Sequence, residues 1–176
     1  MKKDSIIRTA TDSDHGAIWE IFHEVVARGD TYTIDPKISR ENALAYWFAD
    51  GNHVYVAELA TGRVRPNGGQ DRHVLGTYIL RANQGGPGAH VANAAFMVSA
   101  RVRGRGIGHA MAEHCLKEAR TLGFLAMQFN FVVSTNEDAI HLWKKLGFEI
   151  VGTLPAAFKH PDRGYVDAYV MFRSLD

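Results

Sequence analysis

The chain has 176 residues, of which 46% are hydrophobic and 22% are charged, and this composition is typical of a globular protein. The formal net charge of +1 at pH 7 excludes a strong overall positive field, so a general nucleic-acid binder is not expected. Cys115 is the only cysteine, which excludes an intrachain disulfide and a multi-cysteine zinc site and suits a reducing compartment.

Hydrophobic periodicity predicts the elements of the first half of the chain. They are a strand near 5–9, a helix from about 12 to 28, a helix near 40–48, and strands at 53–59, 74–81 and 90–99. Residues 60–72 are rich in glycine, arginine and polar side chains, and they predict a long surface hairpin loop.

The second half alternates helices and strands. A helix at 106–122 has Ile107, Met111 and Cys115 on one face and is ended by Gly123. A strand at 126–133 follows, and the capping box from Ser134 to Glu137 predicts a helix that ends at 147. The last strands are expected near 148–153 and 166–172, so the pattern indicates a mixed α/β fold.

Several classes of segment and site are missing from the sequence. It contains neither the apolar run of about eighteen residues that spans a membrane nor the core of a signal peptide. Its nine histidines show no HExxH motif and no paired ligand spacing. We therefore expect one cytoplasmic domain over residues 1–176, with no metal, membrane or nucleic-acid partner.

The stretch RVRGRGIGHA, residues 101–110, joins a strand end to a helix start and combines arginines with glycines. A helix N-terminus attracts anions, and glycines let an anion approach the backbone closely. A nucleotide phosphate, a nucleic-acid backbone and another polyanion are the candidate ligands, and a tight turn with solvated arginines is the alternative. The Walker motif and the dinucleotide GxGxxG motif both fail on spacing, since no lysine follows and His109 occupies the last glycine position.

Two motifs identify a family that the chain resembles. The spacing of Arg103, Gly106 and Gly108 matches Q/R-x-x-G-x-G/A, the acetyl-CoA pyrophosphate loop of the GCN5-related N-acetyltransferase (GNAT) superfamily. The family's NxxAxxxYxxxGF segment is matched at Asn136, Ala139, Leu146, Gly147 and Phe148. The resemblance extends over residues 6–172 and is weakest in 60–73.

The resemblance implies the GNAT fold, a mostly antiparallel sheet of about six or seven strands flanked by about four helices. Its central parallel pair, here 90–99 and 126–133, splays apart, and acetyl-CoA is the co-substrate that enters the gap. Pantetheine would pair with the backbone of Phe96, Met97 and Val98. The pyrophosphate would lie on the amides of Arg103, Gly104, Arg105, Gly106, Ile107, Gly108 and His109.

The resemblance also implies direct attack by an amine on the thioester. A backbone N–H of Met97 or Val98 would stabilise the oxyanion. Asn136 matches the position that contacts the cofactor arm, and a helix N-cap is its alternative role. Many members carry a tyrosine that protonates the departing thiolate where this chain has Trp143, whose indole is no acid near neutral pH.

The parity of the two central strands suggests where the acceptor binds. In residues 126–133, Met127, Phe129, Phe131 and Val133 share one face, and Gln128 and Asn130 take the other. Buried amides need partners, so Asn93 and Asn130 either satisfy one another and a water or line the acceptor pocket. Tyr32 lies in the region that covers the acceptor in this family, and His90 is the one titratable side chain in 90–99.

These observations predict an acetyl-CoA-dependent N-acetyltransferase acting on a small amine. The stretches 96–108 and 129–161 resemble a microbial subgroup related to fungal enzymes that acetylate the toxic proline analogue azetidine-2-carboxylate. This favours an amino acid as acceptor; a polyamine, an aminoglycoside or a protein N-terminus is the alternative. A non-catalytic acyl-CoA sensor, favoured by Trp143 alone, is a further alternative. Residues 155–169 either complete the acceptor site or form a homodimer contact.

Overall fold

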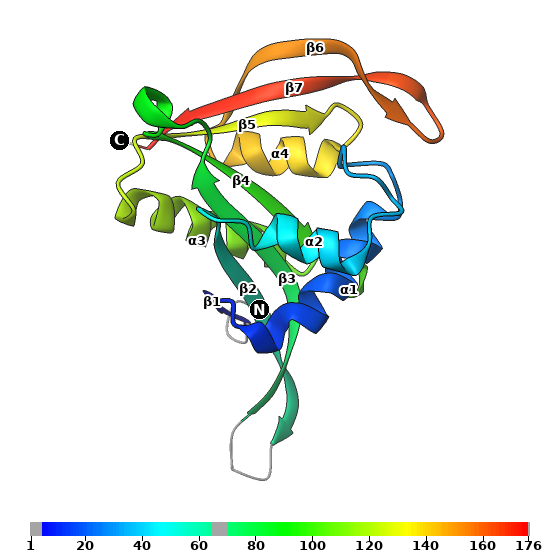
Figure 1. Ribbon diagram of the computed structural model, residues 1–176, viewed down its shortest axis with the longest axis vertical. Coiled ribbons are helices and arrows are strands. Elements are labelled where there is room, and N and C mark those ends of the chain that lie inside the picture. The colour runs from blue at the N-terminus through cyan, green and yellow to red at the C-terminus, as the bar shows by residue number, and fades with distance from the viewer. Residues whose placement is uncertain (1–4, 65–69, 176) are drawn as a thin grey trace.

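The computed structural model describes residues 5–64 and 70–175, and its strands form a single twisted sheet covered by helices on both faces (Figure 1). The strands are β1 (Ser5–Thr9), β2 (His53–Val64), β3 (Gln70–Ala82), β4 (Val91–Val98), β5 (Ala126–Val133), β6 (Glu149–His160) and β7 (Gly164–Ser174). The helices are α1 (His15–Val26), α2 (Arg40–Trp47), α3 (Ile107–Thr121) and α4 (Glu137–Lys145). None of the helices in the described part is long and apolar enough to cross a membrane.

The sheet has the order β1-β2-β3-β4-β5-β7-β6, and β4–β5 is its one parallel pair among the described strands. That pair is joined only at Val91–Ala126 and Ala92–Met127, after which the two strands separate. The mixed, mostly antiparallel sheet, its splayed parallel pair and the four flanking helices confirm the expected fold class.

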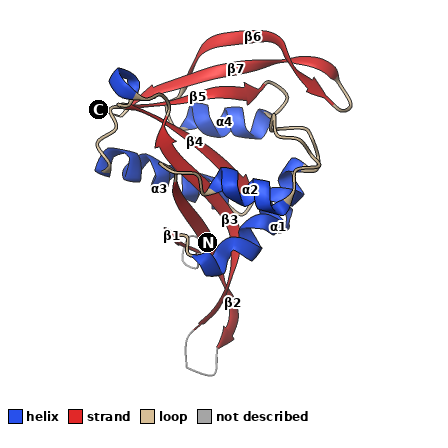
Figure 2. Cartoon of the chain, viewed as in Figure 1, coloured by secondary structure: helices blue, strands red, loops and turns tan. Residues whose placement is uncertain are grey.

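Two hydrophobic cores lie on opposite faces of the sheet. Figure 2 shows the helices that cover these faces. Helices α1 and α2 pack Ile18, Phe22 and Trp47 against Val56, Ile79 and Met97. Helix α3 passes behind the sheet in this view and buries Met111 and Cys115 with Tyr78, Leu80 and Met127. Strands β3 and β4 are therefore buried on both faces, which fixes the position of the edge of β4 that faces the gap.

The strand boundaries differ from the prediction in both hairpins. Strand β2 runs to Val64 and β3 begins at Gln70, so the predicted loop at 60–72 is shorter, and residues 65–69 lie outside the described residues. Strand β6 extends to His160, well past its predicted end at 153, and β7 begins at Gly164, slightly before its predicted start at 166. Each ribbon continues because its two strands pair with one another beyond the rest of the sheet, which sequence periodicity does not report.

Two local predictions in the second half are wrong. Helix α4 is capped by Asn136, whose side chain accepts a hydrogen bond from the Ala139 N–H at 3.3 Å, and not by a Ser134–Glu137 capping box. The pairing of β5 with β7 shifts register between Phe129 and Val132. A bulge of this kind changes the side-chain parity, so Val132 is buried and the single face expected for Met127 to Val133 is interrupted.

An ion-pair cluster holds β1 to the start of α1. The Asp14 carboxylate accepts hydrogen bonds from Arg8 Nη1 at 2.7 Å and Nη2 at 2.9 Å, and from the Thr11 N–H at 2.7 Å. Arg8 also pairs with Glu58 on β2. The hydrogen bonds from Arg8 hold the pKa of Asp14 below its ordinary value despite burial of the side chain.

We predict that Asp14→Asn lowers the free energy of unfolding by ~1–2 kcal/mol at pH 7. The loss is smaller than for a fully buried ion pair because Arg8 is partly exposed and solvent screens its charge. The lowered pKa means that the carboxylate stabilises the fold fully above about pH 4 and loses this effect as pH falls through the folded-state value. Urea unfolding should therefore show the wild type and Asp14→Asn converging towards pH 3. A constant difference down to that pH, or an equal loss in the exposed control Asp50→Asn, contradicts the assignment.

Candidate functional site

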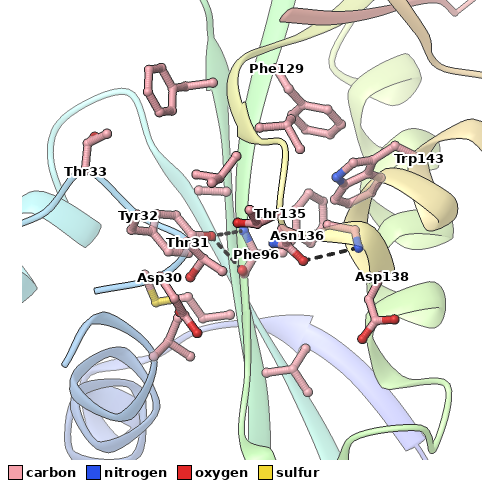
Figure 3. Close-up of a pocket in the computed structure, with 18 of the residues that line it drawn as sticks. Asp30, Thr31, Tyr32, Thr33, Phe96, Phe129, Thr135, Asn136, Asp138 and Trp143 are labelled. Carbon is pink, nitrogen blue, oxygen red and sulfur yellow. Dashed lines mark hydrogen bonds between the residues drawn. The ribbon is translucent and has the colours of Figure 1, made fainter. Parts of the chain in front are cut away.

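A cavity of about 540 Å³ opens where β4 and β5 separate. Its walls come from the α1–α2 segment, the two separating strands, the turn before α3, the start of α4 and the tip of β6. They include Asp30, Thr31, Tyr32, Asn93, Phe96, Val98, Phe129, Asn130, Asn136, Asp138, Trp143 and His160. Figure 3 shows Asp30, Thr31 and Tyr32 on one side of β4, with Thr135, Asn136 and Asp138 across from them.

The backbone of β4 presents to this cavity an edge that has no neighbouring strand. The Tyr32 hydroxyl accepts a hydrogen bond from the Phe96 N–H at 3.1 Å and donates one to the Phe96 carbonyl oxygen at 2.6 Å. On the other edge, the Ser99 N–H donates to the Leu75 oxygen of β3 at 2.9 Å. Because alternate residues of a strand direct their backbone groups to opposite sides, Phe96 and Val98 face the cavity.

The same alternation bears on Met97, one of the two residues whose N–H was predicted to stabilise the oxyanion. Its backbone lies on the β3 side, opposite Thr77, and its side chain is buried in the core under α1. An N–H in that position points away from the gap, so it cannot donate to an oxyanion there. Of the two amides considered from the sequence, that of Val98 has the right direction.

The turn before α3 is left-handed at two glycines. Gly104 has φ +71° and Gly106, the N-cap of α3, has φ +79°, a conformation that other residues rarely adopt. The first bond within the helix runs from the Ala110 N–H to the Gly106 oxygen at 3.0 Å. The N–H groups at 107–109 therefore have no partner within the helix, which makes this end a site for an anion.

Other members of the loop extend this positive region. The side chains of Arg101, Arg103 and Arg105 are exposed, and Arg103 and Gly104 also line the cavity, so the loop and the cavity are continuous. His109 Nδ1 lies 3.2 Å from Glu113 one turn along the helix. At Gly108 the φ angle is not positive, and an added Cβ would lie 3.9 Å from Leu142 and Val98. The fold itself therefore does not require a glycine at 108.

The start of α4 forms the opposite wall. Asn136 lines the cavity and caps α4, so its expected structural role is confirmed. Trp143 is buried, with its ring centroid 4.5 Å from Phe129 and 5.1 Å from Phe96. It closes the gap with an apolar ring that offers a single N–H donor and no acid.

Four amides form a chain along the upper part of the site. The Asn93 side chain donates to the backbone carbonyl oxygen of Gln128 at 2.9 Å. Gln128 Nε2 then donates to Asn130 Oδ1 at 2.8 Å, and Asn130 Nδ2 donates to Asn83 Oδ1 at 2.7 Å. Asn93 and Asn130 thus do not bond to one another: Asn93 is satisfied by a backbone oxygen, and Asn130, which is exposed, is satisfied by Gln128 and Asn83. Both also line the cavity.

Two further predictions have clear outcomes. His90 is exposed and donates from Nδ1 to the Pro87 oxygen at 3.1 Å, outside the cavity lining, so it is not placed as a base for this site. Cys115 is buried in the α3 core, and burial raises the pKa of its thiol, as expected for an inert cysteine. Over residues 5–64 and 70–175, no three His, Cys, Asp or Glu side chains are grouped to hold a metal ion.

Asp30 is a cavity residue that the sequence did not single out, whereas His160 belongs to residues 155–169, which were expected to complete the acceptor site or form a homodimer contact. Asp30 follows Gly29, whose φ of +62° turns the chain after α1 towards β4. His160 ends β6 and reaches the cavity because the β6–β7 ribbon is longer than predicted. A glycine-aspartate pair at a helix end was the available signal for Asp30, and the His-Pro pair among the aromatics of 155–169 was the signal for His160.

The comparisons with known proteins agree on one family. Residues 19–148 match the family model described as Acetyltransferase (GNAT) family. The chain is 32% identical to the curated N-acetyltransferase aca1 of Schizosaccharomyces pombe over 82% of this chain and 72% of that protein.

Solved structures give the same result. A GCN5-related N-acetyltransferase from Kribbella flavida has a TM-score of 0.86 at 41% identity, covering 99% of both chains. The acetyltransferase yncA from Salmonella typhimurium, solved with acetyl-CoA, has a TM-score of 0.80 at 25% identity, covering 99% of this chain and 95% of that one.

Proposed function

The chain belongs to the acetyltransferase (GNAT) family and uses acetyl-CoA as co-substrate, and from this premise we propose that it acetylates the nitrogen of a small amine, with amino acids as the acceptor class. The observation that carries the proposal is the continuity of three features. The splayed strands, the cavity between them and the anion-binding turn before α3 form one path.

The residues along this path fit the parts of acetyl-CoA. The free N–H groups of 107–109 and the arginines before them would hold the pyrophosphate. Phe96 and Val98 would pair with the pantetheine arm as a neighbouring strand does, and Asn136 would contact that arm from the other wall. When bound, acetyl-CoA supplies the thioester whose carbonyl carbon the amine attacks.

The chain's own groups would support this reaction in two ways. The Val98 N–H, which faces the gap, would donate to the oxyanion that develops on the carbonyl. Trp143 would exclude water from the same place, and the departing thiolate would leave without a protein acid at this position. The Tyr32 hydroxyl now holds both backbone groups of Phe96, so it must share or release them when the arm pairs there.

The cavity walls support an amino acid as acceptor. Neutral amides line the β4 and β5 sides, and carboxylates are present only at Asp30 and Asp138 among the lining residues. A polyamine or an aminoglycoside carries several positive charges and would be matched by clustered acids, whereas amides suit the carboxylate of an amino acid.

The direct test of this function is a thiol-release screen with acetyl-CoA. The acceptors are amino acids, azetidine-2-carboxylate, phosphinothricin, spermidine and kanamycin. We expect turnover to concentrate in the amino acids and their analogues. Turnover restricted to the polyamine or the aminoglycoside would contradict the acceptor class, and release of CoA with none of them would contradict the small-amine proposal.

The role of the turn is tested by Gly108→Asp. Because the fold has room for a Cβ here, the variant should keep its thermal midpoint while the new carboxylate repels the diphosphate. We predict that the Kd for acetyl-CoA, measured by calorimetry, rises at least about 100-fold, or ~2.7 kcal/mol. The matched control is Gly85→Asp in an exposed turn with open space around it. Equal acetyl-CoA affinity in both variants would disprove the assignment.

Asn93→Ala and Asn130→Ala test the acceptor wall. We predict that each raises the acceptor KM about tenfold, or ~1.4 kcal/mol, with the acetyl-CoA Kd changed less than about twofold. Asn83→Ala is the control, because Asn83 belongs to the same chain of amides but does not line the cavity. Acceptor kinetics that stay at the wild-type level in both test variants, or that change equally in the control, would rule out direct contact.

A further inference from the structure

Two adjacent residues of the α1–α2 segment carry polar atoms that lack a hydrogen-bond partner. Within the described part of the chain, the buried side-chain nitrogen and oxygen atoms without a hydrogen-bond partner are Asp30 Oδ1 and Thr31 Oγ1. Arg28 Nε lies 3.6 Å from Asp30 Oδ1, so the two side chains form an ion pair that is too long for a hydrogen bond. A buried polar atom without a partner costs ~1–3 kcal/mol, so two neighbours of this kind need an explanation.

The segment is held firmly in this position. Helix α1 ends as the Gly29 N–H bonds to the Val26 oxygen at 3.0 Å, and the left-handed Gly29 then redirects the chain. On the other side, the Tyr32 hydroxyl is fastened to both backbone groups of Phe96. Asp30 and Thr31 lie between these two fixed points, and the missing hydrogen bonds therefore do not reflect a loose loop.

Both residues border the cavity at the level of the β4 edge. Each lines the cavity, and Figure 3 shows their side chains beside Tyr32 and Phe96. The Asp30 side chain keeps 33% of its surface exposed, so the carboxylate meets solvent on one side while Oδ1 is turned inward. A small ligand entering beside Phe96 would displace solvent from this carboxylate.

The chemistry of the two oxygens defines what they bind. A carboxylate oxygen can only accept, and a threonine hydroxyl can accept or donate. A donor could therefore bond to either oxygen, and the negative charge of Asp30 favours a cationic donor, which would share the carboxylate with Arg28. Arg28, which also lines the cavity, pairs with Oδ1 without a hydrogen bond and so leaves that acceptor position open. The other carboxylate of the cavity, Asp138, is exposed and lies across the gap at the start of α4.

We propose that Asp30 and Thr31 form the subsite for the nitrogen of the acceptor, and that this subsite selects a cationic aliphatic amine over a neutral molecule of the same shape. The inference deepens the proposed function and rests on it for the identity of the ligand as the acceptor. It assigns the cationic end of the acceptor to the α1–α2 segment, which leaves the amides of β4 and β5 for the carboxylate end.

The test compares two ring probes of one shape, pyrrolidinium and tetrahydrofuran, by NMR titration of the full chain without cofactor. The readouts are the amide resonances of Thr31 and Phe96. We expect the wild type to bind pyrrolidinium at least about tenfold more tightly than tetrahydrofuran. Asp30→Asn should remove this preference, and Thr31→Val should reduce it about threefold. The control Asp138→Asn should retain it.

Three results would overturn the proposal: equal affinity of the wild type for both probes, an unchanged preference in Asp30→Asn, or the same loss in Asp138→Asn. If Asp30→Asn does not fold, Thr31→Val decides, since an unchanged preference in that variant also refutes the subsite. The measurement needs no turnover. A silent thiol-release screen beside a charge preference that depends on Asp30 would therefore reject the proposed function and keep the cation subsite.

Discussion

The site depends on a failure of pairing: hydrogen bonding between the parallel strands β4 and β5 stops after two residue pairs. Beyond them, the facing backbone groups of β4 have no strand to bond. Buried backbone groups without partners are costly, so this edge must be met by something else. In this structure the Tyr32 hydroxyl meets Phe96, and further along a ligand with its own amides is the natural partner for Val98.

Packing on both faces keeps the strands apart. On one side the ring of Trp143 contacts Phe96 of β4 and Phe129 of β5, so an aromatic cluster spans the gap. On the other side the α1–α2 segment is fixed to β4 through Tyr32. The cavity is thus a built feature of the core, and the turn before α3 continues it to a helix end rich in unpaired N–H groups. The proposed cofactor loop and acceptor wall are adjacent because both begin at the same two strands.

Much of this arrangement could be predicted from the sequence. Helix α3 and strand β5 were predicted within a residue or two because their apolar spacing and flanking glycines are local signals. The glycine turn before α3 was predicted for the same reason, since spacing alone places Gly104 and Gly106 before a helix. The direction of the Met97 amide, the bulge after Phe129 and the reach of His160 could not be predicted, because each depends on pairing with a distant strand. The orphaned oxygens of Asp30 and Thr31 are visible only once the loop is packed.

The central claim is that the free edge of β4 and the first turn of α3 together bind acetyl-CoA through main-chain N–H groups. Residue-resolved hydrogen exchange with and without acetyl-CoA tests it most directly. The account predicts that the amides of Val98, Ile107, Gly108 and His109 become protected on binding, whereas the amide of Met97, directed at β3, does not change. Saturation with acetyl-CoA that leaves the exchange of Val98 and Gly108 unaltered would contradict it.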